Sequence, residues 1–235
     1  MEQIQHVIAG MPFNSDIERR NRALIAFTLL TGARDSAIAS MKLKHVDVVG
    51  GSVFQDAREV RTKFSKTFST YFFPVGDEIR QIVDDWVKYL REEKLWSHDD
   101  PLFPASNVVL DHITHHFIVE GLKREHWSTA TLIRKIFAEA FTNAGLPYFN
   151  PHSFRNTLVR LGETVCQTPE AFKAWSQNLG HEKVLTTFCS YGEVSNRRQQ
   201  EILEGLKSPQ LSTPLDAKEI AKAVARELRN AKPGE

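Results

Sequence analysis

The sequence predicts a mainly α-helical protein that carries one small three-stranded antiparallel sheet, an α+β fold. Two observations support this fold class. Apolar residues recur at helical spacing in most of the chain, most clearly between Ile79 and Leu90. Between residues 46 and 75 the pattern changes to β-branched and aromatic residues around Gly50-Gly51, which is typical of short strands joined by turns. With 235 residues, the chain is long enough to bury a full hydrophobic core.

The first predicted helix begins at a capping box formed by Ser15 and Glu18, whose side chains can bind free backbone groups of the first turn. Gly32 ends this helix, and a second helix is predicted from about Asp35 to Met41. The strands are expected after it, with β-branched and aromatic residues recurring over 60–64 and 67–73.

The second half of the chain is predicted to be helical, whereas residues 95–127 show no clear pattern. A helix from Thr129 is expected to end at Gly145 and Pro147. Further helices are predicted over 151–165, 169–178, 182–190, 194–206 and 216–231. We expect residues 1–207 to form one domain, and residues 208–235 to be a linker followed by a docking helix.

Composition indicates a soluble globular protein. Charged residues make up 25% and apolar residues 41% of the chain, and the net charge of +1 neither favours nor excludes nucleic acid as a partner. The sequence has no secretory signal pattern and no apolar run long enough to cross a bilayer. We therefore expect a cytoplasmic protein whose two cysteines, Cys166 and Cys189, are reduced.

Five residues are candidates for a site that acts on a phosphodiester. Arg34 follows the end of an apolar helix, and His152 and Arg155 share one face of a later helix. His181 and Tyr191 follow, ten residues apart. We expect Tyr191 to be the only tyrosine within reach of the other four groups.

These residue types suit phosphoryl transfer without a metal. An Arg side chain binds phosphate in a bidentate manner and keeps its charge, so two of them can stabilise the negative charge that develops in the transition state. A Tyr hydroxyl, with a free pKa of about 10, needs a base before it can attack, and a histidine can act as that base. A phosphotyrosyl bond would retain the energy of the broken strand, so rejoining would need no ATP.

The order of these groups resembles the tyrosine recombinase, or phage integrase, family over about residues 10 to 205. Three boxes carry the resemblance: Thr31-Gly32-Ala33-Arg34, then His152 and Arg155 in Pro151-His152-Ser153-Phe154-Arg155, then Leu179-Gly180-His181 followed by Tyr191. The resemblance implies the tyrosine recombinase catalytic-domain fold. In the family the two arginines and the second histidine hold the scissile phosphate, and the tyrosine is the nucleophile.

A hairpin lysine completes the family's set of catalytic groups. Lys66, with Pro74 eight residues later, resembles the lysine that protonates the leaving 5′ oxygen, and Lys63 is the competing choice. The acidic residue that commonly lies three positions after the first arginine is replaced by Ala37 in this chain, and Asp35 is the candidate for its orienting role.

The resemblance implies a site-specific recombinase that cleaves and rejoins DNA through a 3′-phosphotyrosyl intermediate, for prophage or mobile-element integration. It implies double-stranded DNA as partner, self-association on DNA as a tetramer, and no cofactor, metal, membrane or small-molecule substrate. Because little sequence precedes the first predicted helix, we expect the family's N-terminal DNA-clamping domain to be absent.

Two other functions fit the same fold. One is a catalytically silent DNA-binding remnant or regulator, which Ala37 and a His181–Tyr191 interval one residue longer than the commonest keep open. The other is a type IB topoisomerase-like enzyme that relaxes DNA without a partner strand. A metal site at the His-rich segment 111–116 is not assigned, because its spacing is poor for a closed site.

Overall fold

The computed structural model describes residues 1–112 and 115–181, together with Arg197 and Gln200. The chain divides into two units, Met1–Ser190 and Tyr191–Glu235, and every helix and strand with described bounds belongs to the first. This unit is mainly helical with a three-stranded antiparallel sheet, so the predicted fold class is confirmed. The helices predicted beyond residue 181, and the linker after residue 207, lie outside the described residues apart from the two isolated positions.

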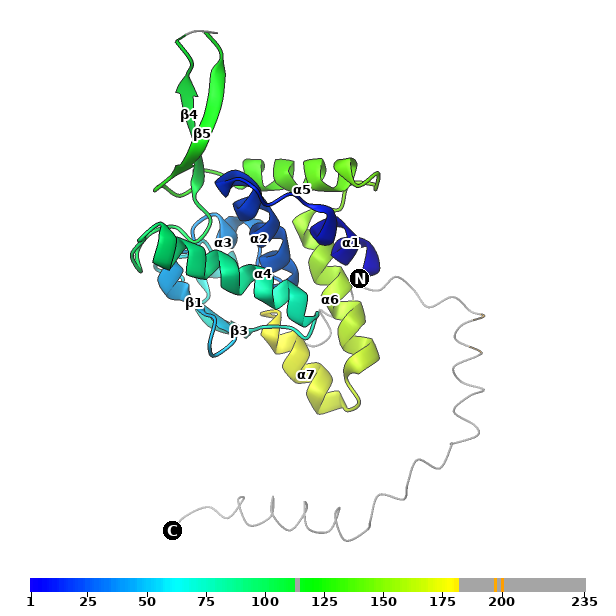
Figure 1. The fold of residues 1–235 in the computed structure, drawn as a ribbon. Coiled ribbons are helices and arrows are strands. Elements are labelled where there is room, and N and C mark those ends of the chain that lie inside the picture. The colour runs from blue at the N-terminus through cyan, green and yellow to red at the C-terminus, as the bar shows by residue number, and fades with distance from the viewer. Residues whose placement is uncertain (113–114, 182–196, 198–199, 201–235) are drawn as a thin grey trace, which may run out of the picture. The chain divides into compact units, whose positions relative to one another are not determined.

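Helix α2, Asp16–Thr31, forms the centre of the core (Figure 1). It begins at the predicted capping box: the Ser15 hydroxyl accepts from the Glu18 N–H at 3.3 Å, and the Glu18 carboxylate accepts from the Ser15 N–H at 2.9 Å. Every residue from Ala23 to Thr31 is buried, so the second half of α2 is covered on all sides. Helix α1, Glu2–Gly10, precedes it and was not predicted from the sequence.

The three-stranded sheet consists of β1 (Val46–Asp47), β2 (Ser52–Gln55) and β3 (Phe68–Tyr71), which pair antiparallel in the order β1-β2-β3. Residues 60–64, although rich in strand-forming types, form no strand. Instead, Lys63–Ser65 is a short 3-10 turn in which Phe64 has a φ of 60°.

The other helices follow the predicted order. Helix α3 (Asp35–Ile38) is shorter than expected, because a turn replaces the helix before Met41. The remaining helices are α4 (Asp77–Lys88), which continues as a π-helical segment Tyr89–Glu93, α5 (Thr131–Asn143), α6 (Pro151–Val165) and α7 (Pro169–Asn178). No helix within residues 1–112 and 115–181 is both long and apolar enough to span a bilayer.

A two-stranded hairpin of β4 (Ala105–Leu110) and β5 (Phe117–Lys123) projects away from the helices (Figure 1). It lies in the segment for which the sequence showed no clear pattern. Val108 pairs with Val119 and Leu110 with Phe117, so these four apolar side chains share one face. All four are exposed, and the hairpin therefore adds nothing to the core through that face.

Candidate active site

One hollow of about 440 Å³ contains three of the predicted site residues. It is bounded by the loop after α2, by α5, and by the start of α6. The residues that line it are Arg34, Asp35, Arg134, Tyr148, Asn150, Pro151, His152 and Arg155. The structure thus brings together the arginine of the first predicted box with both residues of the second.

Arg155 connects the three predicted boxes. Its side chain is buried, and its Nη1 donates to the Gly32 carbonyl at 2.5 Å while Nη2 donates to the Leu179 carbonyl at 2.5 Å. Nη2 also lies 3.2 Å from His181 Nε2. Burial, and then the positive charge of Arg34, lower the pKa of Arg155 to about 9, so it stays protonated at neutral pH.

His181 is held as a neutral imidazole. Because a guanidinium can only donate, its contact with His181 Nε2 requires that nitrogen to accept, which leaves the ring proton on Nδ1. Burial first, and then the charges of Arg155 and Arg34, lower the pKa of His181 to about 4. At neutral pH the ring can therefore accept a proton or, through Nδ1, donate a hydrogen bond.

His152 lies in the first turn of α6, which Asn150 caps by accepting from the Ser153 N–H at 3.0 Å. Burial, followed by the charges of Arg155 and Arg34, lowers the pKa of His152 below its usual value. It is thus neutral at physiological pH, and it has the protonation state that a general base needs.

Arg34 occupies the N-cap position of α3 and is half-buried. Among the residues that the structure describes, its guanidinium has no hydrogen-bond or ion-pair partner. Burial lowers the pKa of Arg34, which shows that its charge is partly removed from water. A desolvated cation without an acceptor is a ready site for an anion.

Gly32 lets the loop of the first box approach the third. It ends α2 with a φ of 62°, a left-handed conformation that a residue with a Cβ rarely adopts. A Cβ at this position would come within 2.9 Å of Leu179 Cδ2 and 3.0 Å of Leu158 Cδ1. The same loop presents the Gly32 carbonyl to Arg155.

The two candidate lysines lie between β2 and β3. Lys63 Nζ is 4.8 Å from the centre of the Phe64 ring, and Lys66 Nζ is 6.0 Å from it. The charge of Lys63 contributes to the lowered pKa values of His152 and His181. Assignment of Lys66 as the general acid stays a prediction.

Two residues of the hollow were missed by sequence reasoning, and a third has an unexpected partner. Asp35, the candidate for orienting Arg34, instead accepts from Arg134 Nε at 2.7 Å. Tyr148 lines the hollow, so the expectation that Tyr191 is the only phenol within reach is wrong. No motif marks Arg134 or Tyr148, and only the folding of α5 against the loop after α2 brings them there.

Tyr191, the predicted nucleophile, lies outside the described residues, as does Cys189. Within the described ranges, no group of three or more His, Cys, Asp or Glu side chains forms a potential metal site.

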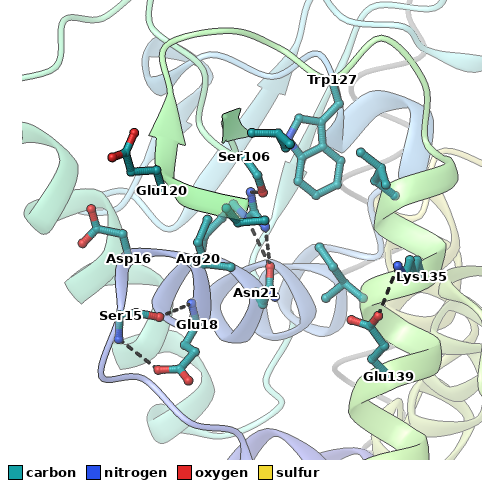
Figure 2. Close-up of a pocket in the computed structure, with 16 residues that line it drawn as sticks. Ser15, Asp16, Glu18, Arg20, Asn21, Ser106, Glu120, Trp127, Lys135 and Glu139 are labelled. Atoms are coloured by element: carbon teal, nitrogen blue, oxygen red, sulfur yellow. Dashed lines mark hydrogen bonds and ion pairs between the residues drawn. The ribbon is translucent and has the colours of Figure 1, made fainter. Parts of the chain in front are cut away.

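A larger hollow of about 910 Å³ lies between the start of α2, the base of the β4–β5 hairpin and α5, and contains none of the predicted site residues (Figure 2). Arg20 is buried beside it and makes no ion pair with any residue of the described ranges. It donates to the Pro104 carbonyl at 2.9 Å and to Ser106 Oγ at 3.0 Å, and it stacks 4.9 Å from the Trp127 ring centre. Arg20 thus joins the hairpin to α2.

Comparison with known proteins finds tyrosine recombinases. The tyrosine recombinase XerC of Lactobacillus leichmannii is 24% identical over 187 residues, which cover 79% of this chain and 55% of that protein. The XerC of Halalkalibacterium halodurans is 23% identical over 206 residues, covering 86% and 59%. This chain therefore spans about half the length of the curated relatives it matches.

Solved structures show the same fold. The XerA recombinase matches with a TM-score of 0.58 at 17% identity, covering 88% of this chain and 62% of that one. The XerH site-specific recombinase, bound to a palindromic difH substrate after cleavage, matches with a TM-score of 0.60 at 18% identity, covering 88% and 51%. The profile of the phage integrase family matches residues 1–198, which is most of the chain. The chain thus belongs to the phage integrase family of tyrosine recombinases.

Proposed function

We propose that this chain is the catalytic part of a site-specific DNA recombinase that cleaves and rejoins strands through a 3′-phosphotyrosyl intermediate. The observation that carries the proposal is the hollow in which Arg34, whose guanidinium has no described partner, lies with Arg155 and a neutral His152. This arrangement supplies positive charge for a phosphate and a base for a hydroxyl, and family membership supplies the reaction class.

Each side chain has one role in the proposed mechanism. Arg34 binds the non-bridging oxygens of the scissile phosphate, and Arg155 and His181 stabilise the charge that develops on them. His152 takes the proton of the Tyr191 hydroxyl as that oxygen attacks phosphorus. The bond to the 5′ oxygen breaks, and Lys66 gives this oxygen its proton.

Rejoining is the same step in reverse. The 5′ hydroxyl of a partner strand attacks phosphorus and returns its proton to Lys66, while the bond to Tyr191 breaks and the tyrosine oxygen leaves with the proton that His152 returns. The relatives named recombinases, and the XerH structure with its difH substrate, support DNA exchange at a specific site. We propose integration of a prophage or mobile element as the context, with self-association on double-stranded DNA and neither metal nor cofactor.

A covalent trap tests the proposal. Duplexes selected by binding from a random pool would be nicked one base from each candidate scissile position, so that the released fragment diffuses away and religation fails. We expect a protein–DNA adduct on a denaturing gel with the unaltered chain, none with Tyr191→Phe, and an adduct with the matched control Tyr71→Phe, which lies on β3. An adduct that survives Tyr191→Phe would contradict the nucleophile, and no adduct with bound DNA would indicate a silent DNA-binding protein.

A second substrate decides between the lysines and between reaction classes. Sulfur in place of the scissile 5′ oxygen makes a leaving group that needs no proton, so it should rescue only the variant that lacks the general acid. We expect rescue of Lys66→Ala, and rescue of Lys63→Ala alone would move the role to Lys63. Relaxation of supercoiled plasmid without exchange of strands between two duplexes would favour a topoisomerase-like enzyme.

A further inference from the structure

Two of the residues that line the hollow have no role in the proposed mechanism. Arg134 comes from α5, and Tyr148 from the segment that joins α5 to α6. The Arg134 side chain is 59% exposed and the Tyr148 residue 47% exposed, although both line the hollow. Neither belongs to a motif of the sequence.

Arg134 is fixed by one edge only. Its Nε donates to Asp35 Oδ2 at 2.7 Å, and the two terminal nitrogens have no acceptor among the described residues. Asp35 directly follows Arg34 in the chain, so this bond ties α5 to the loop that carries Arg34. The unused edge of a guanidinium is the fork that binds phosphate oxygens.

The charge of the hollow favours an anion larger than one phosphate group. Its eight lining residues include three arginines and a single acidic residue, Asp35. The Asp35 carboxylate, and to a lesser extent the Tyr148 hydroxyl, raise the pKa of Arg134, so this guanidinium stays charged. A volume of about 440 Å³ is also in the range of sites that hold whole small molecules.

We propose that Arg134 and Tyr148 form a second phosphate subsite, which binds a backbone phosphate adjacent to the reacting one on the same strand. The inference rests on the proposed function, because it takes DNA to be the ligand of the hollow. Phosphates repeat at short, regular intervals along a strand, so a strand held at Arg34 must bring a neighbouring phosphate close to it. Arg134 supplies charge and a fork, Tyr148 supplies a hydroxyl donor, and Asp35 positions Arg134.

The salt dependence of DNA binding measures such a contact without knowledge of the target sequence. The probe is a fluorescein-labelled duplex of arbitrary sequence, about 30 bp long, titrated with the full chain between about 50 and 200 mM salt. We expect Arg134→Ala to reduce the slope of log K against log salt by about 0.9, the value for one phosphate contact. Arg34→Ala, which removes the charge of another arginine that lines the hollow, should reduce it by a similar amount.

Lys135→Ala is the matched control, because it removes the same charge from the next residue of α5. Lys135 lies instead in the larger hollow and pairs with Glu139 at 3.7 Å (Figure 2). We expect its slope to be unchanged. Arg134→Lys should keep the slope but weaken binding about three- to tenfold, because a point charge replaces the fork. Tyr148→Phe should weaken binding about fivefold at an unchanged slope.

The outcomes separate this inference from the function on which it rests. If Arg34→Ala lowers the slope and Arg134→Ala does not, the second subsite is overturned while the proposed function stands. If neither variant lowers the slope, DNA does not occupy the hollow and both proposals are overturned. If Arg134→Ala lowers thermal stability but leaves the slope unchanged, the Arg134–Asp35 pair stabilises the fold without binding phosphate. That result would overturn the subsite.

Discussion

Arg34 and Arg155 have the same proposed ligand but opposite relations to the protein around them. Arg155 is 5% exposed and donates to two backbone carbonyls, whereas Arg34 has no acceptor in the part of the chain that the structure describes. Arg155 therefore stabilises the fold and also lines the site, whereas Arg34 contributes only to the site. Substitution separates these roles.

We predict that Arg155→Ala lowers the free energy of unfolding by about 3 kcal/mol, because it leaves two buried carbonyls unpaired and opens a cavity. Arg34→Ala should change this free energy by less than about 0.5 kcal/mol, since no described contact is lost. Urea unfolding of both variants measures the difference. Equal losses of stability in the two variants would contradict the distinction.

The histidines give the protein a stability that depends on pH. Because the pKa of His181 is 6.5 when free and about 4 in the fold, the unfolded chain binds a proton between these values that the folded chain does not. Stability is therefore complete above pH 6.5, falls as the pH drops toward 4, and levels off below that. For a partly exposed ring we expect a loss on the order of 1 to 2 kcal/mol.

Thermal unfolding of the unaltered chain and of His181→Gln between about pH 4 and 6.5 tests whether stability falls on acidification and whether His181 causes the fall. The glutamine carbonyl can still accept from Arg155 but does not titrate, so the variant should lose less stability on acidification. His152, whose pKa is also lowered, acts in the same direction and should account for part of the remaining slope. An identical pH dependence in the two proteins would rule out His181 as the source.

Among the elements, α6 and α7 form the platform for the second and third boxes, and they meet at a close contact. Trp175 Nε1 donates to the Leu158 carbonyl at 2.9 Å, which brings the indole against Gly162. A Cβ on Gly162 would lie 2.6 Å from Trp175 Nε1. The indole fits only because this position of α6 has no side chain.

We predict that Gly162→Ala destabilises the protein by about 1 to 3 kcal/mol, because the two helices must separate or the indole must leave its place. The control is Gly10→Ala at the end of α1, where a Cβ would meet nothing within 4 Å, and where we expect no loss. The free energy of urea unfolding compares the two. A neutral Gly162→Ala would show that α7 moves freely against α6.

The elements also show which parts of the fold a sequence can predict. The bounds 151–165 and 169–178 match α6 and α7, because each helix combines a cap, a first-turn proline and regular apolar spacing. The β4–β5 hairpin was missed although it contains Val108-Val109-Leu110 and Phe117-Ile118-Val119. Its apolar residues do not alternate with polar ones, so neither strand has a pattern of one buried and one exposed face.

At the scale of the whole molecule, the net charge of +1 hides a strongly uneven distribution. The smaller hollow is lined by three arginines and one acidic residue. The larger hollow is lined by four acidic residues and by two basic ones, Arg20 and Lys135. Composition alone could not indicate a nucleic-acid partner for this reason. The ordered motifs could indicate such a partner, because they identify the particular residues that lie together in the fold, whereas composition only counts residue types.

The only residues of the candidate site that could be predicted are those that match the short motifs of the family. Arg34, His152, Arg155 and His181 follow from short boxes in a fixed order, and the structure brings these four together. Arg134 and Tyr148 reach the hollow through the position of α5, which its buried residues such as Ile133 and Phe137 set. The sequence around Arg134 and Tyr148 therefore does not indicate that they line the hollow.

The hydrogen bonds of Arg155 have a further consequence for the living cell. Its two carbonyl partners lie 123 and 24 residues away along the chain, so neither bond exists until distant segments of this unit have met. A nascent or partly unfolded chain can therefore contain every proposed catalytic side chain and still have no place to hold a phosphate. Formation of the proposed phosphate site is therefore tied to completion of the fold.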